Sequence, residues 1–291
     1  MYELIKVTDR TYYIECPAKI GIYLDDDGAI LIDSGGDKDG GKKALKHLDA
    51  NGWTLKAIIN THSNADHIGG NQVIINRLGV TAYTTKKEGA INEWPQFEPT
   101  ILYGGYPCKA LRNKFLMAKP TEYTDINEME MPDGMEYFEL PGHYIDMIGI
   151  KTPDDVYFMA DCVSSPEILD KYKVGFIYDV GAYLETLDKI EDLKGVKFVP
   201  AHTPACDDMK ELARVNRENV LANIELIKDI CREGATAEQI QKEVFDRYGL
   251  VMDFNQYVLV GSTLRSYCSY MADQGMLEYE FTDNRLCWKT I

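Results

Sequence analysis

The chain has 291 residues, of which 45% are hydrophobic, and carries a formal net charge of −16. This length and apolar content suffice for one large domain with an appendage, whereas so acidic a chain repels phosphate backbones and makes nucleic acid a poor substrate. No uncharged apolar run reaches the roughly 18 to 20 residues of a membrane helix, and residues 1–6 lack the layout of a signal peptide. We therefore expect a cytoplasmic protein that acts on a small molecule, away from membranes.

The seven cysteines are scattered through the chain and form no CxxC pair. An odd number at such spacings is not typical of a disulfide framework or of a thiolate zinc site. We expect reduced and mostly buried thiols.

Short β-rich runs alternate with turn signals in the first third of the chain, which predicts hairpins in a sheet. The predicted strands are 11–15, 20–24, 29–33, 55–60 and 80–84. Apolar residues at helical spacing predict two helices between them. These helices are 41–50, which ends at Asn51-Gly52, and 68–78.

Residues 86–130 show no clear period and are rich in large side chains, with Lys109, Arg112 and Lys114 among them. A long insertion of this kind is typical of a lid or pocket wall. Trp94, Arg112 and Lys114 are therefore candidates to contact a substrate, and the basic residues favour an anionic one. A solvated surface loop held by aromatic residues is an equally good interpretation.

Strand patterns return after the insertion, and helical patterns dominate from about residue 207. The predicted elements are strands 135–140, 147–152, 156–160 and 197–200, helices 182–193, 210–232, 236–248 and 255–274, and a hairpin of 276–281 with 285–289. Thr236 is a candidate N-cap. Three helices followed by a hairpin are typical of a winged-helix-like module.

A winged helix invites a DNA-binding hypothesis, but residues 207–291 hold ten basic against fifteen acidic residues. An acidic module is a poor phosphate clamp. We assign this part to packing on the main domain or to the formation of a homodimer.

Four of the five histidines lie in polar motifs, and the densest motif contains His62, Asn64, Asp66 and His67. Imidazole is the commonest neutral ligand of zinc or iron, and a carboxylate next to a histidine lets one loop serve one or two ions. Three further motifs along the chain end in Gly142-His143, Asp161 and Pro200-Ala201-His202; His47 lies outside the set.

This order of motifs resembles the metallo-β-lactamase superfamily, whose pattern is HxHxDH, a later GH, an aspartate that ends a strand, and a final histidine. The resemblance covers about residues 1–205. It implies an α/β fold, the αββα sandwich, with a metal site at one rim of two sheets. We expect a catalytic domain over residues 1–206, with 86–130 as insertion or lid, and a mainly helical C-terminal domain over 207–291.

The resemblance also implies the roles of individual residues. The first metal would be bound by His62, Asn64 and His143. The second metal would be bound by Asp66, His67 and His202. Asp161 would bridge the two, and Asp33 resembles the superfamily's outer-shell carboxylate that orients a ligand imidazole.

Asn64 departs from the superfamily pattern, which has a histidine there. An amide oxygen is a weaker donor to zinc than an imidazole, although it is acceptable to manganese or iron. We therefore expect one tight ion, zinc as first choice with iron or manganese as alternatives, at the second position and a loose or absent ion at the first.

Tyr144 and Asp161 each have two interpretations, and Cys162 follows Asp161 directly. Tyr144 is a candidate to donate a hydrogen bond to an oxyanion, or it is a packing aromatic. Asp161 is a metal ligand, or it caps a helix that follows. Cys162 should point away from Asp161 and be buried.

The resemblance implies a metal-dependent hydrolase in which Asp66 both ligates metal and accepts a proton. Esters, thioesters, lactones, lactams and phosphodiesters are all substrates within the superfamily, and the sequence does not choose among them. The alternatives are a mononuclear iron oxidoreductase of the dioxygenase type and a non-catalytic metal-binding or sensing protein. For a sensor, Asn64→His should leave metal content and activity unchanged.

Overall fold

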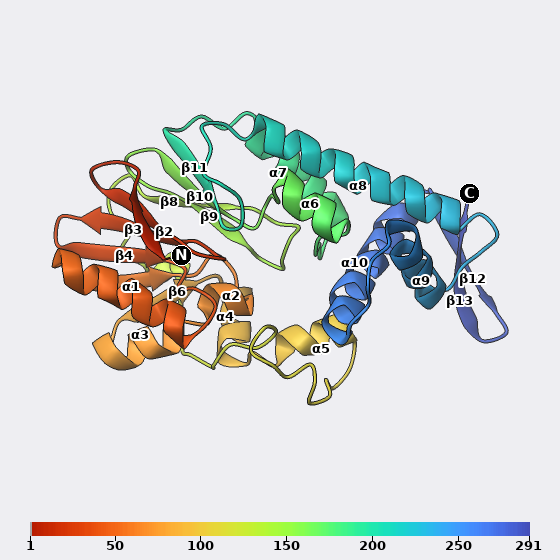
Figure 1. The fold of residues 1–291 in the computed structure, drawn as a ribbon, viewed down its shortest axis with the longest axis horizontal. Coiled ribbons are helices and arrows are strands. Elements are labelled where there is room, and N and C mark those ends of the chain that lie inside the picture. Colours follow the sequence, from red (N-terminus) through yellow and green to blue (C-terminus); the bar gives the residue numbers. More distant parts are fainter. Residues whose placement is uncertain (1) are drawn as a thin grey trace.

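The computed structural model describes residues 2–291 and contains two facing sheets and a C-terminal hairpin (Figure 1). The larger sheet follows chain order, with antiparallel pairs from β1 to β4 and parallel pairs from β4 to β7. Its strands are β1 (Glu3–Lys6), β2 (Thr11–Glu15), β3 (Ile20–Asp25), β4 (Gly28–Ile32), β5 (Leu55–Ile59), β6 (Thr81–Thr84) and β7 (Thr124–Asp125).

The smaller sheet has the order β11-β10-β9-β8, and β10 runs parallel to β11. Its strands are β8 (Glu136–Glu139), β9 (Ile148–Lys151), β10 (Val156–Ala160) and β11 (Lys197–Pro200). The helices before residue 207 are α1 (Lys38–Asn51), α2 (Ala65–Ile68), α3 (Asn71–Leu78), α4 (Lys86–Glu93), α5 (Phe97–Tyr103), α6 (Pro166–Tyr172) and α7 (Val180–Glu191), with a short 3-10 turn at Ile126–Glu128.

Alternation along the strands separates the layers, because successive side chains of a strand point to opposite faces. In β4, Ile30 and Ile32 pack against the smaller sheet, whereas Leu31 packs with Leu45 of α1. In β10, Phe158 joins the layer between the sheets, and the residues on either side of it, Tyr157 and Met159, join the cluster with α7. The order helix, sheet, sheet, helix confirms the αββα sandwich.

The C-terminal part contains the three helices and the hairpin in the expected order. They are α8 (Lys210–Ile230), α9 (Ala237–Tyr248), α10 (Phe254–Asp273), β12 (Leu277–Thr282) and β13 (Arg285–Thr290). Thr236 caps α9 with a capping box in which Gln239 returns the hydrogen bond. Between residues 2 and 291, no helix has both the length and the apolar character that crossing a bilayer requires.

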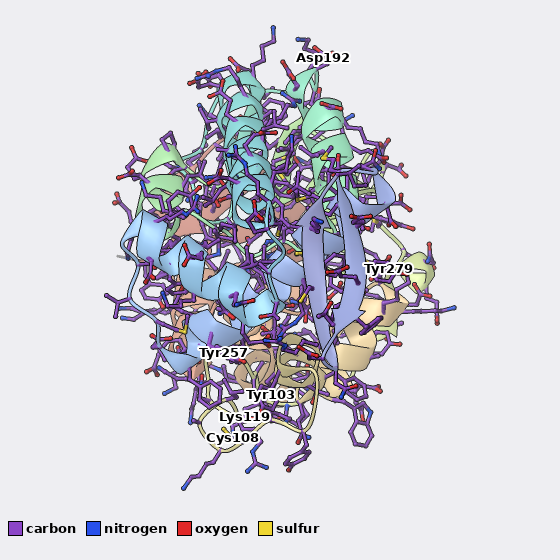
Figure 2. All side chains as sticks on the ribbon, turned by 90° about the vertical axis from the view of Figure 1, so that its right-hand side faces the viewer. Tyr103, Cys108, Lys119, Asp192, Tyr257 and Tyr279 are labelled. Carbon is purple, nitrogen blue, oxygen red and sulfur yellow. The ribbon has the colours of Figure 1, made fainter. Side chains whose placement is uncertain are left out.

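The C-terminal helices pack on the rest of the chain at two places. Helix α8 lies along α7, and α10 lies against α5 of the insertion. Figure 2 shows this end of the molecule, with Tyr257 of α10 next to Tyr103 of α5. The ring of Tyr103 is 6.2 Å from that of Phe254, at the start of α10.

Some predicted elements were wrong. The predicted helix 68–78 is interrupted, because the amide of Gly70 donates to the carbonyl of Gly35 in a neighbouring loop and not to its own helix. A Cβ on Gly70 would lie 2.2 Å from the carbonyl oxygen of Ser34, so this close approach requires glycine. Strand β1 was missed altogether.

Residues 86–130 are not irregular throughout, since they contain α4 and α5. The inward face of α4 carries the buried polar residues Glu88 and Asn92, so the segment lacks the apolar period of a helix. Helix α6 was also missed. Its N-cap is Ser165, so the interpretation of Asp161 as a helix cap is wrong.

The cysteines behave as expected. In the described chain all seven are free, and four of them, Cys162 included, are buried.

Candidate metal centre

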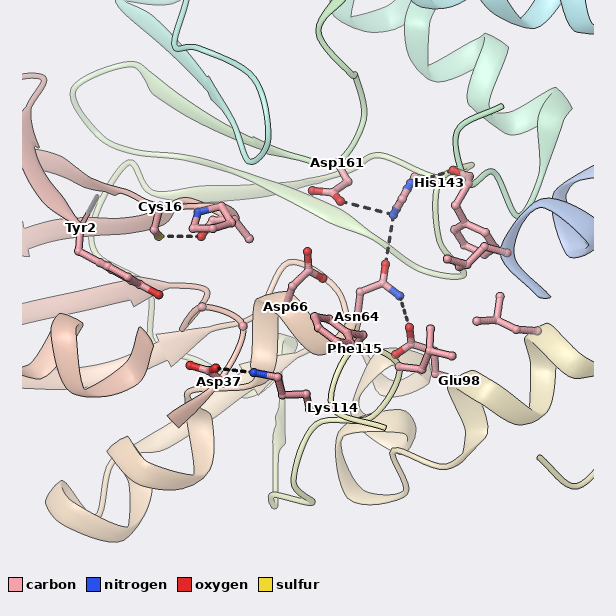
Figure 3. A pocket seen from close by; sticks show the side chains of 18 residues that line it. Tyr2, Cys16, Asp37, Asn64, Asp66, Glu98, Lys114, Phe115, His143 and Asp161 are labelled. Carbon is pink, nitrogen blue, oxygen red and sulfur yellow. Dashed lines mark hydrogen bonds and ion pairs between the residues drawn. The ribbon is translucent and has the colours of Figure 1, made fainter. Parts of the chain in front are cut away.

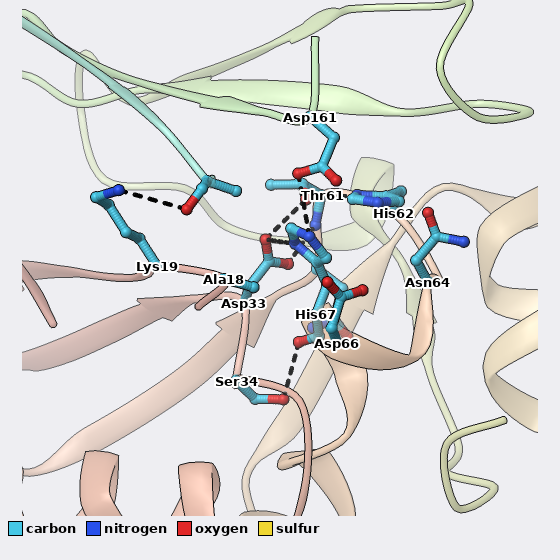
Figure 4. Close-up of polar contacts among 12 residues, drawn as sticks. Ala18, Lys19, Asp33, Ser34, Thr61, His62, Asn64, Asp66, His67 and Asp161 are labelled. Carbon is cyan, nitrogen blue, oxygen red and sulfur yellow. Dashed lines mark hydrogen bonds and ion pairs between the residues drawn. The ribbon is translucent and has the colours of Figure 1, made fainter. Parts of the chain in front are cut away.

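The metal-ligand candidates lie where strands end at one rim of the sandwich (Figure 4). Asp33 follows β4, the loop from His62 to His67 follows β5, and Asp161 follows β10. Because neighbouring parallel strands end at the same edge, chain segments far apart in sequence meet here. The structure brings six candidates together as two groups whose ligand atoms lie within 4.8 Å of one another: His62, His143 and Asp161, and Asp66, His67 and His202.

Asp161 touches both groups. Its Oδ1 is 3.1 Å from Nε2 of His67, and its Oδ2 is 3.2 Å from Nε2 of His202 and 3.6 Å from Nε2 of His143. Nε2 of His202 is also 3.2 Å from Oδ2 of Asp66. Asp161 therefore contacts members of both ligand groups.

Three of the imidazoles are held by a hydrogen bond at the nitrogen that faces away from the centre. Nδ1 of His67 is 2.8 Å from the Asp33 carboxylate, Nδ1 of His143 is 3.0 Å from the Phe176 carbonyl, and Nδ1 of His202 is 2.6 Å from a backbone carbonyl, that of Pro17. Carboxylates and carbonyls only accept, so each Nδ1 donates. In its neutral form, each ring therefore presents the lone pair of Nε2 to the centre.

The imidazole of His62 is oriented in the same way, but by a hydroxyl group. The Thr61 hydroxyl donates to Asp33 at 2.8 Å, which leaves its oxygen to accept from Nδ1 of His62 at 3.0 Å. Asp33 thus orients His67 directly and His62 through Thr61, as an outer-shell carboxylate does.

Three atoms of the centre are orphaned. Among the described residues, nothing forms a hydrogen bond with the buried Nε2 of His62, Nε2 of His67 or Oδ1 of Asp161, although the last two atoms lie 3.1 Å apart and form an ion pair when His67 is protonated. A buried polar atom without a partner is costly. Lone pairs that approach one another without a hydrogen bond are what a cation would satisfy, so the side chains present fit a metal.

Unusual backbone conformations aim two of these side chains. Ala160, directly before Asp161, has φ +47°, and Asp33 has φ +61°. Left-handed conformations in residues other than glycine are strained and gather at functional sites. Gly142, before His143, has φ +121°, and a Cβ there would lie 2.3 Å from Cα of Tyr183. Only glycine fits at this turn.

The sequence profile of the metallo-β-lactamase superfamily matches residues 14–202. The chain belongs to this superfamily. Membership implies a divalent metal, and the two ligand groups are where the chain could hold it.

Solved structures of the same fold agree. A β-lactamase domain protein from Burkholderia ambifaria has a TM-score of 0.78 at 15% identity, over 99% of this chain and 94% of that one. A metallo-β-lactamase family protein from Thermus thermophilus has a TM-score of 0.72 at 16% identity, over 98% and 100%. A metallo-β-lactamase from Pontibacter korlensis has a TM-score of 0.54 at 17% identity, over 76% and 99%. At these identities the likeness shows the fold alone.

The electrostatics of this superfamily site are those of acids and imidazoles packed together. Burial, helped by the charge of His67, lowers the pKa of His62 well below its usual value. Burial also lowers the pKa of His202, but the carboxylates of Asp161 and Asp66 outweigh it and raise that pKa to about 10. Burial raises the pKa of Asp161, yet His202 and His67 hold it well below its usual range. Protons therefore occupy part of the centre when metal does not.

Asn64 also faces the centre. Its Oδ1 is 3.1 Å from Nε2 of His143, and its Nδ2 donates to Oε1 of Glu98 at 3.1 Å. Burial, with the charge of Asp66 next, raises the pKa of Glu98 well above its usual value.

Sequence reasoning missed two buried carboxyls beside the centre, Glu98 and Glu88. Glu88 accepts from the amide and the hydroxyl of Ser63 and from the amide of Asp146. Burial raises the pKa of Glu88 to about 7, although these hydrogen bonds oppose the shift. A glutamate in a segment without periodicity gives no signal that it is buried, so neither residue could be found from the pattern.

A pocket of about 470 Å³ opens onto the centre (Figure 3). Asn64, Asp66, His143 and Asp161 form its polar floor. Its apolar walls come from the insertion, from the loop after α6 and from α10. These wall residues are Leu102, Phe115, Leu116, Phe176 and Leu259.

The three residues predicted to contact the substrate do not all lie at the pocket. Lys114 lines the pocket and pairs with Asp37 at 3.4 Å. Trp94 and Arg112 are not among the described residues that line it, because Trp94 projects into solvent with 65% of its surface exposed and Arg112 turns outward.

Tyr144 is 2% exposed and is not among the described residues that line the pocket. Its ring lies 5.9 Å from that of His62 and 6.5 Å from that of His143, and its buried hydroxyl forms no hydrogen bond with the described residues.

Proposed function

We propose that the protein is a metal-dependent hydrolase that attacks its substrate with a metal-activated water. The observation that carries this proposal is the pair of ligand groups joined by Asp161 on the floor of the pocket. A bound divalent cation would lower the pKa of water from about 15.7 toward about 7 and polarise the bond to be broken.

The chain's own residues have separate parts in this proposal. His67, His202, Asp66 and Asp161 would hold the tighter ion, with zinc as first choice and iron or manganese as alternatives. Asp66 is the acidic residue best placed to accept a proton, since it lines the pocket and its side chain is 47% exposed. The other carboxylate among these ligands, Asp161, is only 11% exposed.

The pocket favours a small substrate with a carbonyl group and an apolar part. Its walls are leucine and phenylalanine, and Lys114 is the one Lys or Arg among the described residues that line it. Because Asp37 pairs with Lys114, little positive charge is left for a phosphodiester or another strongly anionic substrate. Esters, thioesters, lactones and lactams with apolar groups are therefore the substrate class that we propose.

The proposal is tested with metal-loaded protein and a panel of esters, thioesters, lactones, lactams and phosphodiesters. We expect turnover that chelation abolishes, with kcat/KM rising by up to about fourfold for each methylene added to the acyl group until the pocket is full. Leu259→Ala should weaken this dependence on length, whereas Leu221→Ala, at an exposed site on α8, should not.

Absence of metal-dependent turnover on every class would overturn the proposal. Oxygen uptake by iron-loaded protein, without hydrolysis, would support the oxidoreductase alternative.

A further inference from the structure

The orientation of the Asn64 amide follows from its partners, because the oxygen of an amide accepts hydrogen bonds whereas its nitrogen donates them. Nδ2 of Asn64 donates to Oε1 of Glu98 at 3.1 Å, and the amide oxygen therefore faces the centre, 3.1 Å from Nε2 of His143 (Figure 3).

On the far side of the amide, two lone pairs meet. His143 donates from Nδ1 to the Phe176 carbonyl, so its neutral ring presents a lone pair at Nε2. That atom lies 3.1 Å from Oδ1 of Asn64 and 3.6 Å from Oδ2 of Asp161. Three acceptors converge at this point, beside the orphaned Nε2 of His62. A cation is what satisfies such a group.

The Glu98 carboxyl contacts the loop of the centre at two points, the Asn64 amide and the backbone of Ala65. Glu98 lies on α5 of the insertion, its side chain is nearly fully buried, and it lines the pocket next to Asn64. A buried carboxylate is costly unless it is hydrogen-bonded or near a positive charge. A cation at the first position, across the amide, would favour the ionised form that orients Asn64.

We propose that Glu98 is a positioning residue that turns the oxygen of Asn64 toward the first metal position. That position then offers two imidazole nitrogens, an amide oxygen and a carboxylate oxygen, from His62, His143, Asn64 and Asp161. Such a set suits an oxygen-preferring divalent cation such as Mn²⁺ or Fe²⁺ better than a set with a third imidazole does. The inference rests on the proposed function, because both need a metal at this centre.

The test measures the affinity of metal-free protein for Mn²⁺. The electron paramagnetic resonance signal of the free ion monitors how much Mn²⁺ remains unbound. Glu98→Gln should weaken the first position by about tenfold, because the new amide can present either group to Asn64 and no longer fixes its oxygen. Glu93→Gln makes the same chemical change at an exposed site of the insertion and should have no effect. Circular dichroism checks the fold of each variant.

Repeating the measurement in an Asn64→Asp variant separates a positioning role of Glu98 from a packing role. With Asn64→Asp, a carboxylate replaces the amide, and a glutamine introduced by Glu98→Gln could donate to it. Glu98→Gln should therefore leave Mn²⁺ affinity unchanged or raise it in this background, whereas it lowers the affinity in the native chain. An equal loss in both backgrounds, or no loss in the native chain, would overturn the inference.

Asn64→His supplies an independent readout. It should raise the ratio of Zn²⁺ to Mn²⁺ affinity at the first position by at least about tenfold, since it adds a third imidazole. An unchanged ratio would contradict this inference but would leave the proposed function standing. If the native chain binds no divalent cation at all, the proposed function itself fails.

Discussion

At the scale of single residues, the sequence motifs predicted which side chains meet, and the structure adds how each is held. His62, His67, His143 and His202 each have one ring nitrogen hydrogen-bonded to the protein, and the other nitrogen faces the centre. These hydrogen bonds could not be predicted from the motifs, because the backbone carbonyls of Pro17 and Phe176 carry no sequence signal. The resemblance did point to Asp33.

The first prediction follows from the protons in the metal-free centre. Because the carboxylates raise the pKa of His202 to about 10, against the effect of burial, that ring is protonated at neutral pH and must lose its proton to bind metal. Metal affinity should therefore rise with pH, with on the order of one or two protons released per ion at pH 7.

Calorimetry of Zn²⁺ binding in buffers of different ionisation enthalpy measures this release. The result that contradicts the prediction is binding with no proton release and equal affinity at pH 6 and pH 8.

At the scale of elements, the helices that sequence reasoning found and missed differ in their buried faces. Helices α8 and α9 bury apolar residues at helical spacing, and their patterns were readable. Helix α4 buries Glu88 and Asn92, and α5 is only seven residues long. Glu88 and Glu98 join these two helices to the His62–His67 loop through polar contacts, which apolar periodicity cannot predict. Their apolar contacts come from single residues, Ile91 of α4 and Leu102 of α5.

The second prediction concerns the start of α9. The Thr236 side chain accepts from the Gln239 amide, and the Gln239 side chain accepts from the Thr236 amide. Thr236→Ala should lower the free energy of unfolding by about 1 kcal/mol, because it removes this cap. Urea unfolding measures the change.

Thr282→Ala, at an exposed position of the hairpin, serves as the control and should be nearly neutral. An unchanged free energy of unfolding, or loss of metal binding by Thr236→Ala, would contradict the prediction that the cap only stabilises α9.

At the scale of the whole molecule, the two regions share one core. The apolar cluster behind the smaller sheet continues through α7 and α8 to α9 and α10. Alternating strands and the motif order predicted the sandwich, but they did not place α10 over the pocket. That placement depends on contacts such as Val258 with Leu111 and Leu116 of the insertion, which are remote in sequence and follow no local rule.

The most direct test is anomalous diffraction from crystals of metal-loaded protein, collected on both sides of the zinc, iron and manganese absorption edges. We predict a strong peak among Asp66, His67, His202 and Asp161, and a second, more weakly occupied one among His62, Asn64, His143 and Asp161. Crystals with no anomalous peak at either place, or with ions bound only elsewhere, would contradict the account.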